Sequence, residues 1–302
     1  GFPASEVLYK EDGSVKGVRA QGPSGELEFY GRHILITTGG YAMNPKVFED
    51  LIGEPTYTTG TWPNNLGKGL ELATSVGGVL RGHELHMPGT GSILASDSFP
   101  TKVYAEFNTY PLQRPPWEIW VNNDGERFIR EDEPLTEKRA AALNDQDKFR
   151  YAIIFDEQIF RSAPPGINGW SRGKMLDHFK SHPMFLISDS ISQLAIKAQI
   201  DPKGLQETID RYNSSVSTGS DFLGRVYMPR PIESPPYYAV LHHGHSATSS
   251  VGIKVDDLLR VVDSNDKPIP NLYAAGEVLG SGVSLGRVFT PGMMLTPALT
   301  LG

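Results

Sequence analysis

The chain of 302 residues contains no cysteine. Disulfide bonds, thiolate metal sites, iron–sulfur clusters and thiol nucleophiles are therefore excluded, because each of them requires cysteine sulfur. The compartment stays open, since a protein without disulfides can be cytosolic or exported. No targeting signal assigns one, and we expect the cytoplasm.

Several other features are also missing. No apolar run reaches the roughly twenty residues that a membrane-spanning helix needs. The formal net charge is −7, and lysine and arginine form no stripe along the sequence, which disfavours a nucleic-acid partner. There is no G-x-S-x-G motif for acyl transfer and no P-loop for nucleotide hydrolysis, so the sequence does not support either activity.

The length favours two domains, or one domain interrupted by another. The composition is that of a folded protein, without low-complexity tracts. The chain begins abruptly at GFPASEVLYK, with neither an initiator Met nor a signal-peptide pattern. We therefore expect a fragment or a processed chain.

Strand patterns dominate the first forty residues. Turns are predicted at Asp12–Gly13 and at Pro23–Gly25, between alternating segments typical of β-structure. The run Ile34–Thr37 is continuously apolar, as expected of a strand buried on both faces. A helical pattern from Leu66 to Val76 then ends at Gly77–Gly78.

The middle of the chain is mixed, and the end returns to strands and glycine turns. Strands are predicted around WEIWV and YAIIFD, and helices over 191–200 and 201–213, the second with Asp201 as N-cap. The C-terminal part is expected to form a buried strand, a glycine loop and the start of a helix. This layout indicates an inserted domain.

A glycine pair, Gly39–Gly40, directly follows the apolar run. Without Cβ atoms, the backbone N–H groups of such a pair can approach a phosphate or a ring edge. A tight turn from strand to helix is the alternative, and these residues alone favour it.

The stretch LYAAGEVLGSGVSLGR at 272–287 joins an apolar strand, a glycine–acid pair and spaced glycines. Its last three glycines follow G-x-G-x-x-x-G, one residue too long for a dinucleotide fingerprint. Glu277 could hold a ribose or ribityl hydroxyl, and Arg287 could hold a carboxylate or carbonyl oxygen. An ordinary loop is the alternative.

Two clusters of titratable residues stand out. Among His242, His243 and His245, with His86 distant in sequence, only His243 and His245 could share a strand face. No HExxH motif or nearby carboxylate completes a site, so we expect no metal, but surface or pocket-lining histidines. The acidic stretch 130–134 could offer paired acids for glycoside chemistry, but a solvated turn is expected.

Taken together, six segments resemble the FAD-dependent fumarate reductase/succinate dehydrogenase flavoprotein superfamily, in particular its soluble oxidoreductases and 3-ketosteroid Δ1-dehydrogenase-like members. They occur in family order over nearly the whole chain: ILITTGGYAMN, NNLGKGLELATSVGGVL, VNNDGERFIRED, LQETIDRYNSSVSTGSDF, PPYYAV and LYAAGEVLGSGVSLGRVFTPGMMLTPALTLG.

The resemblance implies a fold of α/β plus α+β type, in which a partial, Rossmann-like FAD-binding domain is interrupted by an α+β capping domain. The expected boundaries are 1–85 for the β-meander and second half of the FAD-binding domain, 86–240 for the capping and substrate domain, and 241–302 for the C-terminal return. The superfamily's N-terminal G-x-G-x-x-G segment, which holds the FAD pyrophosphate, has no counterpart in the sequence. Weak or no FAD retention is therefore expected of this chain alone.

The implied cofactor is FAD. By resemblance, the following residues lie along it: Thr38, Gly39 and Gly40 near the cofactor, Gly276 and Glu277 along its ribityl-pyrophosphate arm, and Leu295 and Thr296 with their backbone near the isoalloxazine ring. A helix N-terminus at 296–298 would stabilise negative charge on the reduced flavin.

The implied chemistry is hydride exchange between flavin N5 and a carbon next to a carbonyl or carboxylate, with a protein acid or base handling the proton. Arg287 matches the substrate arginine of the superfamily. The position of the catalytic arginine falls on Leu135, and Arg139 is reached only by allowing a gap. His245 lies close to a histidine position without aligning to it, and Tyr110 completes the catalytic candidates.

These departures disfavour fumarate as the substrate, and Val288 stands where ketosteroid dehydrogenases place a tyrosine. Four aromatic residues suit a larger and less polar substrate, or form the core of the capping domain: Tyr104, Phe107, Tyr110 and Trp117.

The function expected is that of an FAD-dependent C–C dehydrogenase or ene-reductase, whose partners are a small molecule with an activated C–C bond and the missing N-terminal segment. A non-catalytic, truncated or proteolysed flavoprotein fragment is the alternative. A metal-binding or carbohydrate-active protein is the third hypothesis.

Overall fold

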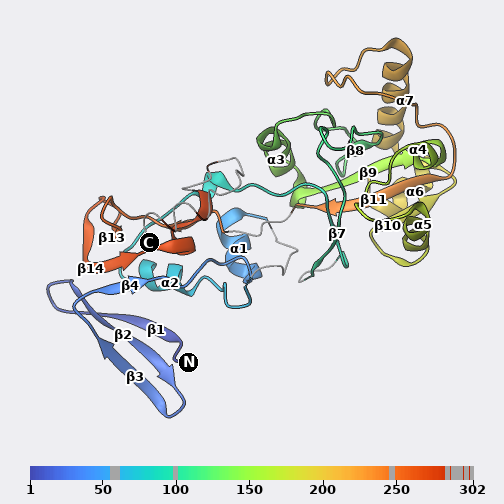
Figure 1. Cartoon of the computed structure of the whole chain (residues 1–302). Coiled ribbons are helices and arrows are strands. Elements are labelled where there is room, and N and C mark those ends of the chain that lie inside the picture. Colours follow the sequence, from blue (N-terminus) through green and yellow to red (C-terminus); the bar gives the residue numbers. More distant parts are fainter. Residues whose placement is uncertain are drawn as a thin grey trace. The chain divides into compact units, whose positions relative to one another are not determined.

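The computed structural model describes residues 1–54, 62–97, 101–244 and 249–282, together with 286, 295 and 299. The chain divides into two compact units (Figure 1). The first unit comprises Gly1–Pro55, Thr61–His86 and Ala247–Gly302, and the second comprises Thr56–Gly60 and Met87–Ser246. The second unit is thus an insertion in the chain of the first.

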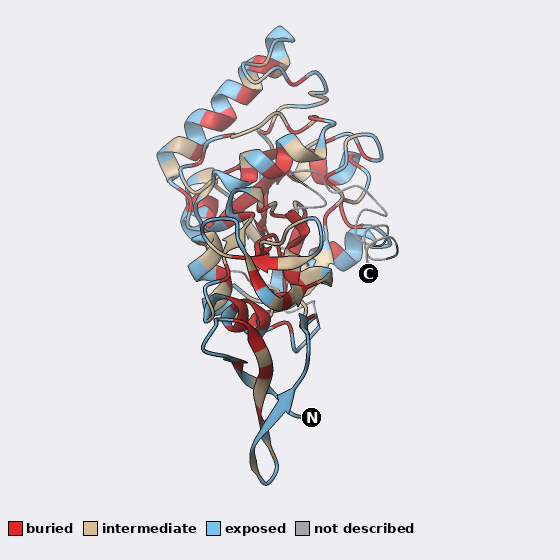
Figure 2. Cartoon of the chain, turned by 90° about the vertical axis from the view of Figure 1, so that its left-hand side faces the viewer, coloured by how far each residue is buried: buried red, intermediate tan, exposed pale blue. Residues whose placement is uncertain are grey.

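The first unit begins with an antiparallel meander of β1 (Ala4–Tyr9), β2 (Val15–Gly22) and β3 (Gly25–Tyr30). The predicted turns are confirmed. Gly13 and Gly25 both have positive φ angles, 79° and 119°, which glycine adopts without steric cost. The edge strand β3 of the meander is largely exposed, and Figure 2 shows this exposure in pale blue.

A second small sheet of the first unit has the order β13-β14-β4, with β13 (Arg260–Val262), β14 (Pro268–Ala274) and β4 (Ile34–Ile36). The prediction that the apolar run is buried on both faces is wrong. Ile36 is 4% exposed but Leu35 is 58% exposed. Side chains alternate between the faces of a strand, and only the face that carries Ile36 is covered by the core.

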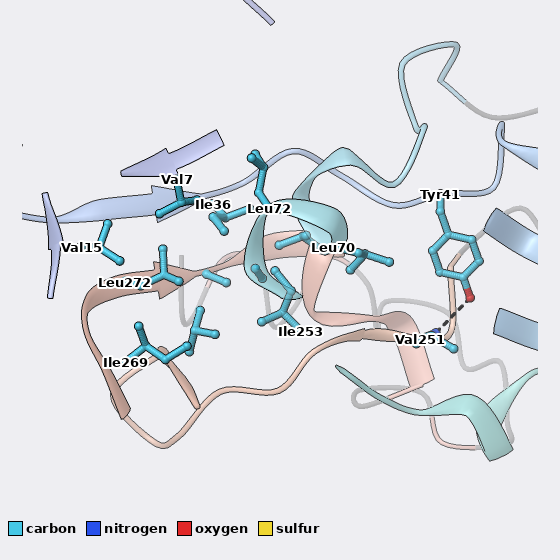
Figure 3. Close-up of a cluster of buried hydrophobic side chains, with 14 of the residues drawn as sticks. Val7, Val15, Ile36, Tyr41, Leu70, Leu72, Val251, Ile253, Ile269 and Leu272 are labelled. Carbon is cyan, nitrogen blue, oxygen red and sulfur yellow. Dashed lines mark hydrogen bonds between the residues drawn. The ribbon is translucent and has the colours of Figure 1, made fainter. Parts of the chain in front are cut away.

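Helices α1 (Pro45–Ile52) and α2 (Lys68–Thr74) complete the first unit's core. The helix predicted over 66–76 is confirmed in its central part, and Gly77 follows with a φ of 89°. Figure 3 shows the buried cluster, which includes Val7, Val15, Ile36, Leu70, Leu72, Ile253, Ile269 and Leu272. The short elements of this unit are β5 (Leu80–Arg81), η1 (His83–Leu85), β12 (Gly252–Ile253) and η3 (Gly276–Leu279).

The second unit is built on an antiparallel sheet of order β10-β11-β9-β8. Its strands are β8 (Ile119–Val121), β9 (Arg150–Asp156), β10 (Phe185–Ser188) and β11 (Tyr237–His243). Every residue of β9 and β11 is buried, because α-helices and loops of this unit pack on the sheet. The predicted strand at YAIIFD is confirmed as β9, which lies between β11 and β8 in the sheet.

The remaining elements of the second unit are β6 (Ser92–Leu94), β7 (Val103–Glu106), α3 (Thr136–Asn144), η2 (Asp147–Phe149), α4 (Glu157–Ser162), α5 (Arg172–Ser181), α6 (Ile191–Ala198) and α7 (Pro202–Thr218). The start of α7 is as predicted. The Gly204 N–H donates to the Asp201 carboxylate at 2.7 Å, and Pro202 occupies the first turn, where a missing N–H is harmless.

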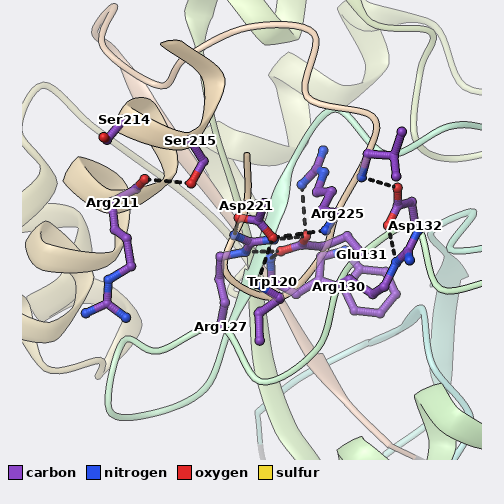
Figure 4. Close-up of polar contacts among 12 residues, drawn as sticks. Trp120, Arg127, Arg130, Glu131, Asp132, Arg211, Ser214, Ser215, Asp221 and Arg225 are labelled. Carbon is purple, nitrogen blue, oxygen red and sulfur yellow. Dashed lines mark hydrogen bonds and ion pairs between the residues drawn. The ribbon is translucent and has the colours of Figure 1, made fainter. Parts of the chain in front are cut away.

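The solvated turn predicted for residues 130–134 is wrong. The Glu131 side chain is fully buried and accepts from two arginines, from Arg127 at 2.6 Å and from Arg225 at 3.0 Å (Figure 4). Arg127 also pairs with Asp221 at 2.6 Å, from beyond the end of α7. These charges can be buried because each one has an opposite charge and hydrogen bonds.

No helix in the described part of the chain is long and apolar enough to cross a membrane.

Candidate functional site

The carboxyl ends of two parallel strands of the first unit lie side by side. The register pairs Leu272 with Ile34 and Ala274 with Ile36, and the Ala275 N–H donates to the Ile36 carbonyl at 3.1 Å. The loops that follow the strands therefore begin at the same sheet edge. This brings together two motifs that the sequence separates by more than 200 residues, Gly39–Gly40 and Gly276–Glu277.

The glycine pair is required by the side chains that pack against it. A Cβ atom at Gly39 would lie 2.6 Å from the Asn65 Oδ1, and one at Gly40 would lie 2.8 Å from the Glu277 Oε1 and overlap the Ser249 hydroxyl. Gly39 also has a φ of 77°, which disfavours other residues. The absence of Cβ atoms thus makes room for three polar side chains of the same unit.

Glu277 lies at the centre of this edge and is half-buried. The Asn65 Nδ2 donates to its Oε2 at 3.4 Å, and its Oε1 lies against Gly40. Gly276 has a φ of 83°, and no atom lies within 4 Å of the place where its Cβ would be. The backbone beside the carboxylate is therefore open.

The short segment Ser249–Val251 forms hydrogen bonds with residues of both loops. The Tyr41 N–H donates to the Ser249 hydroxyl at 2.7 Å, and the Val251 N–H donates to the Tyr41 hydroxyl at 3.2 Å (Figure 3). The Ser281 N–H donates to the Ser249 carbonyl at 2.7 Å. Burial raises the pKa of Tyr41, so its phenol stays neutral and keeps this geometry.

Sequence reasoning missed Asn65 and Ser249. Asn65 lies within one of the segments that carry the family resemblance, but the residue type gives no sign of a partner 212 positions away. Ser249 has no motif of its own. Only the fold reveals both.

In the second unit, the structure brings Arg139 and Tyr110 together. The Arg139 side chain is 1% exposed, and its guanidinium donates to the Glu133 carbonyl at 2.6 Å and to the Thr136 hydroxyl at 3.1 Å. Its Nε has no acceptor, and none of the described carboxylates forms an ion pair with it. Burial lowers the pKa of Arg139. The Tyr110 ring, 49% exposed, has its centroid 5.1 Å from the Arg139 Cζ.

The other aromatic candidates divide into core and surface. Phe107 is 4% exposed and packs edge-on to the His242 ring, so it belongs to the core. Tyr104 is 46% exposed, and its hydroxyl hydrogen-bonds the His178 Nε2 at 2.8 Å. Trp117 is half-buried and meets Tyr227 edge-on.

Two of the clustered histidines do not lie at the surface. His242 is 0% exposed, and its Nδ1 donates to the Ser92 carbonyl at 3.1 Å. Burial lowers the pKa of His242 to about 3, so it is neutral at physiological pH. His243 is 2% exposed and hydrogen-bonds the Asp97 carboxylate at 2.8 Å. The sequence suggests no carboxylate partner, because Asp97 is 146 residues away.

In the described ranges, no group of three or more histidine, cysteine or acidic side chains is arranged to hold a metal ion. His86 is 6% exposed, and burial lowers its pKa to about 4. Its ring packs edge-on to Phe48 at 5.3 Å.

Three predicted site residues, Arg287, His245 and Thr296, lie outside the described residues, as does Val288. Leu295 is described, with a side chain 64% exposed. Leu135, at the position of the superfamily's catalytic arginine, is the N-cap of α3 and is 43% exposed.

Parallel strands that end in glycine loops beside a carboxylate are typical of a nucleotide-binding α/β unit. A sequence model described as "FAD binding domain" matches residues 2–287, and the chain belongs to this family. Its cofactor is FAD. The residues present fit this group: the backbone at Gly276 is open, and the adjacent Glu277 carboxylate would accept hydrogen bonds from cofactor hydroxyls.

Similar proteins include reductases and dehydrogenases. A fumarate reductase (cytochrome) from Shewanella frigidimarina is 28% identical over 98% of this chain and 49% of its own length. A 4-oxocyclohexanecarboxylate 2-dehydrogenase from Sinomonas cyclohexanicum is 25% identical over 98% of this chain and 54% of its own. The chain therefore spans about half the length of these curated relatives.

Solved structures share the fold. The open conformation of a flavocytochrome c3 fumarate reductase matches with a TM-score of 0.62 and 26% identity, over 97% of this chain and 49% of that one. A 3-ketosteroid Δ1-dehydrogenase from Sterolibacterium denitrificans matches with a TM-score of 0.70 and 21% identity, over 99% and 57% of the two chains.

Proposed function

We propose that this chain is part of an FAD-dependent oxidoreductase that moves a hydride between flavin N5 and a C–C bond next to a carbonyl or carboxylate. The observation that carries the proposal is the meeting of Gly39–Gly40 with Gly276–Glu277 at one sheet edge, in a chain of the FAD-binding family. When bound, FAD supplies the hydride exchange. The residues of the chain hold it and handle the substrate and the proton.

On the cofactor side, Glu277 accepts from a hydroxyl of the ribityl or ribose part, and the backbone at Gly276 approaches it without a Cβ in the way. Thr38, Gly39 and Gly40 lie along the same edge. We assign Leu295 and Thr296 to the flavin ring on the strength of the family resemblance.

On the substrate side, Arg139 and Tyr110 are the candidates that the described structure supports. A buried guanidinium with no carboxylate in direct contact and an Nε without an acceptor is costly, and such groups cluster at sites that act on a ligand. Burial also lowers the pKa of Arg139, the direction in which a guanidinium becomes a better proton donor. Arg287, which would hold a substrate oxygen, and His245 remain predictions.

The substrate is less polar than a dicarboxylate in this proposal. Apolar surface is exposed near both candidates. Leu135, at the start of α3, is 43% exposed. In the loop that carries Tyr110, the Tyr110 ring is 49% exposed and Leu112 is 89% exposed. Fumarate reductase activity proper would need a second cationic anchor, and 3-ketosteroid dehydrogenase activity would need the tyrosine that Val288 replaces.

A further segment of the same protein is the proposed partner of β4. Among the described strands β4 lies at the edge of its sheet, and Leu35 on it is 58% exposed. A strand of a nucleotide-binding segment would pair with the backbone groups of this edge, and its following helix would cover the face that carries Leu35. Without such a segment the chain would be a non-catalytic flavoprotein piece, which is the second candidate.

The test is purification of the full-length gene product under mild conditions. We expect a yellow protein whose flavin is reduced anaerobically by a saturated ketone or acid, or reoxidised by the matching enone or enoate. A full-length protein that purifies colourless and takes up no added FAD would overturn the proposal.

A further inference from the structure

We propose that Asn65 is a positioning residue for the cofactor, which acts by fixing the carboxylate of Glu277. This inference rests on the contact between Glu277 and FAD proposed above.

The backbone of Asn65 is fixed on both sides. Its N–H donates to the Trp62 carbonyl at 2.9 Å, and its carbonyl accepts from the Met43 N–H at 3.0 Å. The residue is 6% exposed, although its neighbours Asn64 and Leu66 are exposed. Its side chain therefore points inward from a held backbone, toward the edge that carries the glycine pair.

The amide and the carboxylate meet over Gly39. The Asn65 Nδ2 lies 3.4 Å from the Glu277 Oε2. A Cβ at Gly39 would lie 2.6 Å from the Asn65 Oδ1 and 3.9 Å from the Glu277 Oε2, so both groups border the same small space. Because glycine leaves that space free, the amide reaches the carboxylate.

The donor at position 65 decides the orientation of Glu277. Among the described side chains, none forms an ion pair with Glu277, and the Asn65 amide donates to its Oε2. With Oε2 engaged by the amide, Oε1 remains to accept from a hydroxyl of the cofactor. A carboxylate at position 65 would instead repel Glu277.

The experiment compares three variants of the full-length protein, Asn65→Ala, Asn65→Asp and Asn64→Ala, by titrating FAD into cofactor-free protein and following flavin fluorescence. We expect the Asn65→Ala change to weaken FAD binding about three- to tenfold, the effect of one lost hydrogen bond. The exposed Asn64→Ala variant is the matched control and should bind like the wild type.

Asn65→Asp gives the distinguishing signature. It should bind FAD worst at pH 8 and recover as the pH falls toward about 5, because one of two adjacent carboxyl groups then takes up a proton and becomes a donor. Equal FAD affinity of this variant and the control at both pH values would overturn the inference.

A second measurement needs no FAD. In the cofactor-free protein, the Asn65 side-chain amide signals in ¹H–¹⁵N NMR spectra should shift on Glu277→Gln and stay unchanged on Glu71→Gln, a change at an exposed acid of α2. If the Asn65 amide signals do not shift on Glu277→Gln, the contact between Asn65 and Glu277 is refuted. A wild-type protein that binds no FAD would instead refute the proposed function and leave the NMR result to decide the contact.

Discussion

At the scale of single residues, the packing where Gly39–Gly40 meets Gly276–Glu277 depends on the absence of Cβ atoms at Gly39 and Gly40. The sequence shows the glycine pair, and elementary stereochemistry allows either a tight turn or a close approach to a ligand. The structure adds a third reason, because Asn65, Ser249 and Glu277 occupy the space that a Cβ would take. A motif can thus be recognised before the groups that require it are known.

Gly40→Ala tests this packing. The new Cβ would overlap the Ser249 hydroxyl and approach the Glu277 Oε1, so we expect a loss of about 1–3 kcal/mol in the free energy of unfolding, measured with urea. Gly173→Ala is the control. Gly173 lies in α5 with a nearest neighbour 3.8 Å from the Cβ position, and alanine there should be neutral or slightly stabilising.

Arg139 permits a second residue-scale prediction. In Arg139→Lys the ammonium cannot reproduce the fork that reaches both the Glu133 carbonyl and the Thr136 hydroxyl. We expect turnover by the full-length enzyme to fall on the order of 100-fold while FAD affinity is unchanged. Arg161→Lys, at an exposed surface pair, should leave both unchanged. Equal turnover of the two variants would remove Arg139 from the site.

At the scale of elements, local signals predicted where some elements begin, but not all of their ends: α7 continues to Thr218, beyond the predicted end at 213. Distant pairs escaped the local signals altogether. Asp201–Pro202 marked the start of α7, and Asp12–Gly13 marked the first turn. Contacts such as Arg127 with Asp221, 94 residues apart, leave no periodic trace in the sequence. The acidic stretch 130–134 therefore reads as solvated, although tertiary contacts bury Glu131.

The buried network predicts a dependence of stability on pH. Burial alone would raise the pKa of Asp221, but the hydrogen bond and charge of Arg127, together with the backbone N–H groups of Arg225 and Leu223, outweigh it and lower the pKa. An acid with a lowered folded-state pKa contributes its full stability above its unfolded pKa of about 3.9, and loses it as the pH falls through the folded value.

The measurement is the free energy of unfolding of the wild type and of Asp221→Asn from pH 7 down to pH 2.5. The difference between them should be constant above about pH 4 and shrink below it. Asp210→Asn, at an exposed position of α7, serves as the control and should show no such trend. A difference that grows as the pH falls would contradict the assignment.

At the scale of the whole molecule, the chain is two units that each have a core of their own. The resemblance predicts an inserted capping domain over 86–240, and one of the two compact units of the chain comprises Met87–Ser246 with the short segment Thr56–Gly60. The order of motifs carried this prediction, because no single composition change marks either boundary. The sequence could not predict that one side of β4 is exposed, because an apolar run does not show which neighbouring elements cover it.

Separate cores predict separate unfolding. Differential scanning calorimetry of the FAD-loaded full-length protein should show two transitions, and excess FAD should raise the one that belongs to the first unit. At a free concentration of 100 times Kd, the shift corresponds to about 2.7 kcal/mol. The Asp221→Asn change should lower only the other transition. A single transition that FAD and the mutation move together would contradict this picture.

Ser249 has a consequence for how the cofactor contacts combine. Its hydroxyl accepts from Tyr41, next to the glycine pair, and its carbonyl accepts from Ser281, just beyond η3. The loops that follow β4 and β14 thus share one anchor and cannot shift independently. The free-energy changes of substitutions in the two loops should therefore fail to add, and evolution could adjust one loop only by compensating in the other.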